Sequence, residues 1–439
     1  MAVRNSSLRD PTVLWILIVL FCSIYSVWNP ASKKLAIDFY QFWVVGQEVA
    51  DGQAGNIYSE VERERIGRSH LEQARASNEP VRLETARHRS DLDTFSTPFL
   101  YTVFGAFSSG DYLHDLSVYR VLSLSCLAAS VAALCALLGY GIPGSLIAIL
   151  LLSCWYAPSR SDVIVGNVNH FQLGLLSLFL WLSCRHPTTL GDVAGGVLLG
   201  LAVMFKPNSA LIIGLLAVSW LVRRQKRKFV LEMAGVASGV FLAFVWSSLA
   251  FGDVGIWWSW IAALSNLPSD LISVELGNYA PARLLSETMN VEASWLILLV
   301  CGGLSVAAVM RGRSNGQEAD VDARSGFEDI QVAALASLVT LLAAPLSWLH
   351  YFVAAIPMLL VTLRPMNGEH AAGRGWAIPR VAGFVALLAI MIQPMTMLGL
   401  GEPVDRAVFL CVGTVVLFLV GVAELFGGRP DFADPSEAD

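Results

Sequence analysis

The sequence predicts an all-α, polytopic membrane protein with about 11–13 transmembrane helices. Of its 439 residues, 55% are hydrophobic and only 15% are charged, whereas soluble domains carry about 25% charged residues. The apolar residues form long runs rather than the stripe of an amphipathic helix or the alternation of a strand. The acidic residues gather in the first loop and at the C-terminus, so the net charge of -6 indicates no nucleic-acid partner.

Twelve apolar segments are long enough to consider as spans of about 20 residues each. They lie near 13–28, 117–139, 143–157, 168–184, 190–205, 209–222, 229–251, 292–310, 327–344, 346–363, 378–400 and 405–426. The run at 98–108 is too short to span, and we expect it to re-enter the membrane or lie at its surface. The first segment follows Arg4 and Arg9 and is not followed by a small-residue cleavage site, which indicates a retained signal anchor.

The spans imply one integral membrane domain over residues 1–428. Residues 29–116 would form a long extracytoplasmic loop with short helices, and the acidic tail 429–439 would be disordered. Within the loop, the mixed charges of 59–75 suit a surface helix over the outer face. That helix would either cover an acceptor entrance or be a solvated decoration, and the sequence leaves both interpretations open.

The basic residues set the orientation, because cytoplasmic loops carry the excess of Lys and Arg. With the N-terminus in the cytoplasm, the inner loops hold Arg185, the cluster 223–228, Arg311, Arg313, Arg324, Arg364 and Arg374. The short outer loops hold only Arg160, Lys206, Arg283 and Arg406. The asymmetry predicts a multi-pass protein of the cell inner membrane with a cytoplasmic N-terminus.

This topology brings separate polar motifs to the same outer, periplasmic face. They are Asp38 in an aromatic run, Gly166 to His170, Lys206 to Asn208, the loop 252–291, and Ser347 to His350. Lys206 would cost about 2.5–3.5 kcal/mol deep in lipid, so we expect it to be paired or to lie in a wet cavity.

Six motifs in one order carry a family resemblance. They are Asp38-Phe39-Tyr40, Gly46 and Gly52 ahead of Ile57-Tyr58, Thr97-Pro98-Phe99, Gly166-Asn167-Val168-Asn169, Lys206-Pro207, and Pro345 to Tyr351. The pattern, from about residue 35 to 351, resembles glycosyltransferase family 87 of the GT-C superfamily, which includes polyprenol-phosphate-mannose-dependent mannosyltransferases. Two features depart from the family pattern: the long charged insert from Glu60 to Asp93, and Asn residues at 166–169 where Gly-Gln is expected.

The resemblance implies a membrane glycosyltransferase of GT-C fold. It would transfer a hexose, most simply mannose, from a polyprenyl-phosphate donor to a hydroxyl of a glycolipid or glycan acceptor, on the extracytoplasmic face and with inversion. Asp38 would be the general base. Lys206, His350, Arg160 and His170 are the candidates for binding the donor phosphate, and Tyr40, Asn167, Asn169 and Trp348 are the candidates for the substrate pocket.

The chemistry of such a donor explains why one carboxylate suffices. The polyprenyl phosphate that leaves from this phosphodiester donor is already a weak base, so no general acid is needed to protonate it, in contrast to the paired carboxylates of a glycosidase. The base then takes the proton of the acceptor hydroxyl, and cationic groups stabilise the departing phosphate. No second acid stands beside Asp38, and the seven cysteines lie singly, so we expect no metal and no other cofactor.

Each candidate also has a simpler structural interpretation. Asp38 could cap a short helix, His350 could anchor at the membrane interface, and Lys206 could reach toward lipid headgroups. Asn167, Asn169 and His170 could cap or cross-link helices instead of touching substrate. The basic cluster 223–228 is typical of a topology determinant that contacts lipid headgroups.

Three other functions stay open at this point. A transporter or lipid flippase is the alternative from another class, although such proteins usually show related halves and broken helices at the midplane. An arabinofuranosyltransferase of the same fold would use the same site with a pentose donor. An inactive relative would bind a lipid-linked sugar without turning it over.

Overall fold

The computed structural model describes residues 11–32, 34–77, 79–185, 188–266, 272–314, 321–365, 374–391 and 403–426. All regular structure in these ranges is helical. The helices are α1 (Pro11–Ser32), α2 (Ile37–Ala50), α3 (Glu60–Ala76), α4 (Pro80–His88), α5 (Pro98–Phe107), α6 (Tyr112–Leu137), α7 (Ile142–Leu150), η1 (Leu151–Trp155), α8 (Ala157–Val165), α9 (Asn169–Arg185), α10 (Thr189–Phe205), η2 (Pro207–Ser209), α11 (Ala210–Val222), α12 (Lys226–Phe251), α13 (Ile256–Ser265), α14 (Pro281–Met289), α15 (Ser294–Ser314), α16 (Val321–Ala343), η4 (Leu349–Ala355), α17 (Ile356–Leu363), α18 (Arg374–Met391) and α20 (Pro403–Phe426). The expected disordered tail 429–439 lies outside the described residues.

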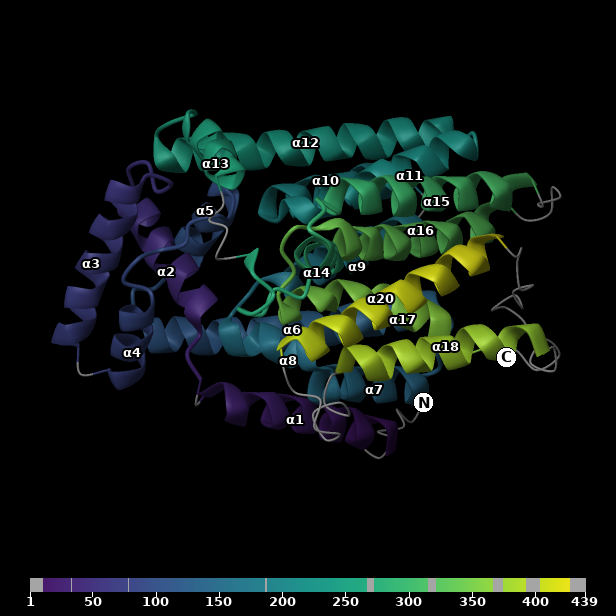
Figure 1. Ribbon diagram of the computed structural model, residues 1–439, viewed down its shortest axis with the longest axis horizontal. Helices are drawn as coiled ribbons and strands as arrows, with labels where there is room; N and C mark the ends of the chain where they lie inside the picture. The colour runs from purple at the N-terminus through teal and green to yellow at the C-terminus, as the bar shows by residue number, and fades with distance from the viewer. Residues whose placement is uncertain are drawn as a thin grey trace, which may run out of the picture.

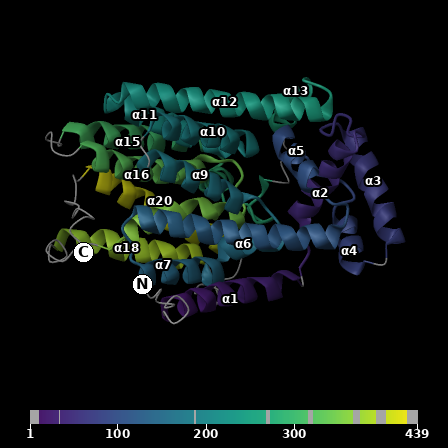
Figure 2. The same ribbon diagram turned by 180° about the vertical axis from the view of Figure 1, so that it is seen from behind.

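The long helices run roughly parallel in one bundle, and α2 to α5 form a cap at one end of it (Figure 1). The view from behind shows the same cap beyond the ends of α6 and α12 (Figure 2). In the described part of the chain, five helices are long and apolar enough to cross a membrane, or six if the bent pair over 142–165 counts as one. Seven further apolar helices are 10–17 residues long. The polytopic helical bundle is confirmed, while the number of spans stays a prediction.

One of two short segments differs from expectation. Residues 157–165, expected as a loop, form α8, which is bent by 57° from the helix before it; Pro158 suits the start of α8, because proline is tolerated in the first turn of a helix. The short run at 98–108 forms α5, whose Phe99, Leu100 and Tyr101 are buried. It packs against α2 where two glycines meet: a β-carbon on Gly105 would lie 2.5 Å from the Gly46 carbonyl oxygen.

Small residues let α10 and α12 approach each other closely. Gly196 and Gly200 on α10 face Gly235 and Gly239 on α12, four residues apart on each helix. A β-carbon at Gly200 would lie only 2.3 Å from the carbonyl oxygen of Val236. Glycine pairs at this spacing are typical of close helix contacts in membranes. This packing positions the C-terminal end of α10, where Lys206 lies.

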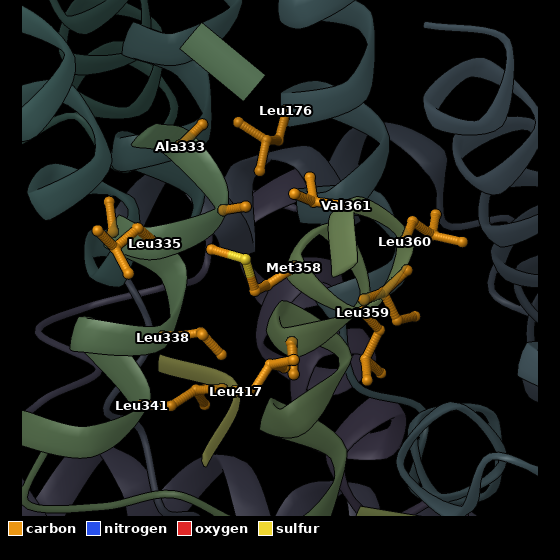
Figure 3. Packing of buried hydrophobic residues seen from close by; sticks show 14 of the residues in the cluster. Leu176, Ala333, Leu335, Leu338, Leu341, Met358, Leu359, Leu360, Val361 and Leu417 are labelled. Carbon is orange, nitrogen blue, oxygen red and sulfur yellow. The ribbon is translucent and has the colours of Figure 1, made fainter. Parts of the chain in front are cut away.

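The central core is built from α9, α16, α17 and α20. Figure 3 shows Met358 of α17 among Leu335 and Leu338 of α16 and Leu417 of α20, all of them buried. The unbranched side chain of methionine fills irregular gaps between such branched residues. This core holds the α16–η4–α17 segment in place, and with it His350.

Arg223 and Lys228 of the basic cluster 223–228 form ion pairs inside the protein. The Lys228 Nζ lies 2.6 Å from Asp329, and Arg223 also pairs with this carboxylate, which is fully buried. The Trp220 indole N–H donates to the same carboxylate. At least these two cations therefore join helices α11, α12 and α16, in addition to the topological role that the sequence predicts for the cluster.

The glycine contact between α10 and α12 gives a direct test of the packing. We expect Gly200→Ala to destabilise the protein by about 1–3 kcal/mol, the usual cost of overpacking, because the added methyl group meets the Val236 carbonyl. The matched control is Gly214→Ala on α11, where a β-carbon would meet nothing within 4 Å. Thermal unfolding in detergent measures both, and an equal melting temperature for the two variants would contradict this packing.

Candidate active site

Asp38 lies in the first turn of α2 with its carboxylate turned toward the bundle. Helix α2 begins after Ala36, and no side-chain hydrogen bond caps it in the described structure. The capping interpretation of Asp38 is therefore not supported. Its Oδ2 instead accepts a hydrogen bond of 2.8 Å from the Asn167 side-chain amide. The Asp38 side chain as a whole keeps 18% of its surface exposed.

Asn167 is brought to Asp38 by the tight turn that ends α8. Gly166 adopts φ +76°, and a β-carbon there would lie 2.4 Å from the β-carbon of Phe39. Only glycine combines this left-handed conformation with so close an approach to another chain segment. The Asp162 carboxylate then accepts from the backbone N–H groups of Asn169 and His170 at the start of α9. The turn between α8 and α9 is thus held by the contact of Gly166 with Phe39 and by the hydrogen bonds to Asp162.

Lys206 reaches the same turn from α10. It adopts an extended conformation (φ -150°, ψ 111°), as expected for a residue before proline, and this ends the helix. Its Nζ donates to Asn169 Oδ1 at 2.5 Å and to Asn167 Oδ1 at 3.3 Å, and it lies 3.7 Å from the centroid of the Tyr351 ring. The amide of Asn167 therefore links the Lys206 ammonium to the Asp38 carboxylate.

His350 completes this side of the site. Its Nε2 lies 3.8 Å from Asp38 Oδ2, beyond hydrogen-bond distance, and this buried atom has no hydrogen-bond partner in the described part of the chain. The loop 252–291 holds the segment in front of it: the Ser347 N–H donates to Asn278 Oδ1 at 2.9 Å. The Ser347 carbonyl in turn accepts from the Tyr279 N–H.

A cation from the charged insert approaches Asp38 from the opposite direction. Arg89 follows α4, and its Nη2 lies 3.5 Å from Asp38 Oδ1 while its Nη1 pairs with Asp93. Burial raises the pKa of Asp38, whereas the Arg89 charge, the Asn167 hydrogen bond and the Lys206 charge lower it. Burial prevails, so the Asp38 carboxylate is more basic than an ordinary aspartate.

An apolar cavity of about 830 Å³ opens beside this site between α5, α6, α9 and α10. Phe171 and Phe205 line its end nearest the site, directly after His170 and before Lys206. Ala129 lines its wall and Trp181 its far end. Since ten residues of helix separate Phe171 from Trp181, the cavity follows α9 for about 15 Å.

The structure therefore brings together Asp38, Asn167, Asn169, Lys206 and His350. Tyr40, expected in the substrate pocket, is only 1% exposed and packs against Trp43 and Tyr112, because neighbouring positions on a helix face different directions. It belongs to the core. His170 is fully buried, and its Nδ1 pairs with the Ser123 hydroxyl at 2.8 Å, so it cross-links α6 and α9.

Two further candidates are Arg160 and Trp348. Arg160 is near the start of α8, the end remote from Gly166. Trp348 packs against Gly277 of the loop 252–291. The phosphate roles of Arg160 and His170 and a substrate contact by Trp348 stay predictions.

Sequence reasoning missed Arg89 and Asp162. Arg89 is one of nine basic residues between positions 29 and 116, and no spacing distinguishes it. Asp162 had a usable signal, since it is an isolated acid seven residues before Asn169. Within the described ranges, no three His, Cys, Asp or Glu side chains are grouped to hold a metal; metal independence stays a prediction.

Comparison with known proteins identifies the family. The model of glycosyltransferase family 87 matches residues 96–327, just over half of the chain. The protein belongs to glycosyltransferase family 87. It is accordingly a membrane glycosyltransferase, and the resemblance predicted from its motifs is confirmed. The matched range includes Asn167, Asn169 and Lys206, whereas Asp38 precedes it and His350 follows it. No curated protein matches the chain, and no solved structure does.

Gly166 offers a test of how the site is assembled. We expect Gly166→Ala to lower the rate of sugar transfer by about 100-fold, since a misplacement of about 1 Å in an active site has effects of this size. Gly52→Ala is the control, because Gly52 is also left-handed (φ +66°) but a β-carbon there meets nothing within 4 Å. Equal activity of both variants would show that the contact with Phe39 does not position Asp38.

Proposed function

We propose that this glycosyltransferase transfers a hexose, with mannose as the first candidate, from a polyprenyl-phosphate donor to an acceptor hydroxyl on the extracytoplasmic face. Asp38 is the general base, and the anomeric configuration inverts. The observation that carries the proposal is the arrangement of Asp38: a partly exposed carboxylate held by Asn167 and placed within one side chain of a lysine. The acceptor is a glycolipid or glycan.

The arrangement matches the needs of a single displacement. The acceptor hydroxyl gives its proton to Asp38 as its oxygen attacks the anomeric carbon, and the bond to the phosphate oxygen breaks on the opposite face. The raised pKa of Asp38 makes it a better base than an exposed aspartate. Since the leaving polyprenyl phosphate is stable as an anion, the site needs positive charge and hydrogen-bond donors there, and no acid.

Lys206 and His350 are the groups proposed to receive the phosphate. Lys206 carries three N–H donors, and its ammonium is oriented by Asn167, Asn169 and the Tyr351 ring. Such preorganised donors stabilise developing charge without reorganisation during the reaction. The buried Nε2 of His350 has no hydrogen-bond partner among the described residues. It can donate to a phosphate or sugar oxygen in the tautomer that protonates it, which would satisfy a buried polar atom that is otherwise unfavourable.

The apolar cavity supports a lipid-linked donor. It begins at Phe205 and Phe171, whose neighbours Lys206 and His170 border the site, and it runs along α9. A polyprenyl chain in this cavity would place its phosphate at the end near Lys206. The apolar lining stabilises a bound hydrocarbon chain by burying its apolar surface. It therefore recognises the lipid chain of the donor and not the sugar.

The base is tested by Asp38→Asn. We expect this variant to keep its melting temperature in detergent and to lose transfer from polyprenyl-phosphate-mannose by at least about 10²–10⁴-fold, the usual contribution of a general base. Asp51→Asn is the matched control, since Asp51 is exposed at the other end of the same helix. Full activity of Asp38→Asn would exclude Asp38 as the base. A panel of polyprenyl-phosphate sugars, pentoses included, then identifies the donor.

The lipid site is tested by filling the cavity. Ala129→Trp should raise KM for a long-chain donor by about ten-fold, equivalent to about two methylene groups left unburied, and should leave KM for a donor with a short chain unchanged. Leu122→Trp is the control, because Leu122 is 53% exposed on the same helix and lies outside the cavity lining. The same KM change with both donors would contradict a chain-binding role.

A further inference from the structure

The insert between Glu60 and Asp93 is a helical hairpin, α3 and α4, fixed firmly to α2. Glu48 of α2 accepts from Arg65 at 2.6 Å and lies 3.1 Å from His70 Nε2. These contacts lower the pKa of Glu48, chiefly through His70, so the ionised carboxylate stabilises the docked hairpin. On the same helix, Trp43 contacts His70 edge-on and lies under the Arg82 guanidinium.

The end of the hairpin is fixed to α2 independently, one turn beyond Asp38. The Gln41 side-chain amide donates to the Asp93 carbonyl and accepts from the Asp93 N–H at 3.1 Å. Asp93 then holds Arg89 through its carboxylate. Arg89 is thus fixed from one side by Asp93, with its side chain only 18% exposed, and its other amino group faces Asp38 at 3.5 Å.

We propose that Arg89 is a positioning residue for the base: together with Asn167 it holds the Asp38 carboxylate through both oxygens, so that the insert is a working part of the transfer site. The inference rests on the proposed role of Asp38. Asn167 binds Oδ2 and Arg89 faces Oδ1, which fixes the plane of the carboxylate and the direction of its remaining lone pairs. Of the two interpretations of the insert, a solvated decoration is thereby set aside.

A role for Arg89 in binding the donor phosphate fits the geometry less well. In a displacement with inversion, the attacking oxygen and the leaving phosphate lie on opposite faces of the sugar. Arg89 faces Oδ1 of the base, whereas His350 and, through Asn167, Lys206 lie at Oδ2. Arg89 is therefore assigned to the side of the attacking hydroxyl, and Lys206 and His350 to the side of the phosphate. Lys206 is one side chain further away, across Asn167, and it lies next to the apolar cavity.

Arg89 also sets the charge state of Asp38. The titratable groups that face Asp38 are Arg89 and Asp93 from the insert, Lys206 after α10, His350 and Tyr351 in η4, and Tyr119 of α6. Among the charges, Arg89 has the largest effect and lowers the Asp38 pKa, against the raising effect of burial. Loss of Arg89 therefore shifts the protonation of Asp38 to higher pH, and the fraction of active base falls at any pH below the new value.

The test is the pH dependence of kcat/KM, which reports groups of the free enzyme. For Arg89→Gln and Arg89→Met we expect the acid limb to move upward by about one pH unit or more, since an opposite charge at about 4–6 Å shifts a carboxyl by about 1–3 units. At high pH the part of the rate loss that comes from protonation of Asp38 should disappear, and the part that comes from a misdirected carboxylate should remain. Arg89→Lys should return the limb most of the way, because it restores the charge.

Arg87→Gln is the control, an exposed arginine on the same hairpin that pairs with Glu84, and it should leave the limb in place. A limb that is unmoved in both Arg89→Gln and Arg89→Met, or a loss of rate that is equal at every pH, would overturn the inference. Asp38→Asn in the same assay separates the two claims. If it is active, the proposed base is wrong; if it is inactive while the limb stays fixed, only the role of Arg89 is wrong.

Discussion

The amide of Asn167 is the interaction on which the site depends. Its N–H₂ group donates to Asp38 and its oxygen accepts from Lys206. One side chain therefore joins the two charged groups of the proposed reaction: the carboxylate that accepts the proton and the cation that binds the phosphate. An amide can do this because it is a donor and an acceptor at once. Three segments meet there: the start of α2, the turn between α8 and α9, and the end of α10. Two of these segments are shaped by residues with a specific backbone preference: Gly166 in the turn, and Pro207 after Lys206.

Much of this could be predicted from the sequence, for a clear physical reason. Long apolar runs indicate spans, and alternating spans decide which polar motifs share a face, so the sequence predicts Asp38, Asn167, Lys206 and His350 at one face. The structure places them at one end of the bundle; the side of the membrane on which that end lies stays a prediction.

The positions of Tyr40 and Arg89 could not be predicted. The first depends on which direction each residue of a helix faces, and the second on how the charged insert docks on α2. Tyr40 stands two residues from Asp38 and was expected beside it, but a step of two residues turns a helix by about 200°, and Tyr40 lies in the aromatic core. Arg89 is separated from Asp38 by 51 residues and reaches it only because Glu48, Trp43 and Gln41 hold the hairpin. The two departures from the family pattern, the insert and the Asn residues at 167 and 169, both turn out to contact the site itself.

The account divides the enzyme into a lipid-facing part and a polar part that meet at Lys206. The apolar cavity along α9 suits a hydrocarbon chain, whereas the hairpin and Asn167 act on the carboxylate. Its central claim is that one carboxylate acts once, as a base. The most direct measurement is the anomeric configuration of the product formed by the purified protein from polyprenyl-phosphate-mannose, determined by NMR. The account predicts a configuration inverted relative to the donor. A retained configuration would require two successive displacements and would contradict it.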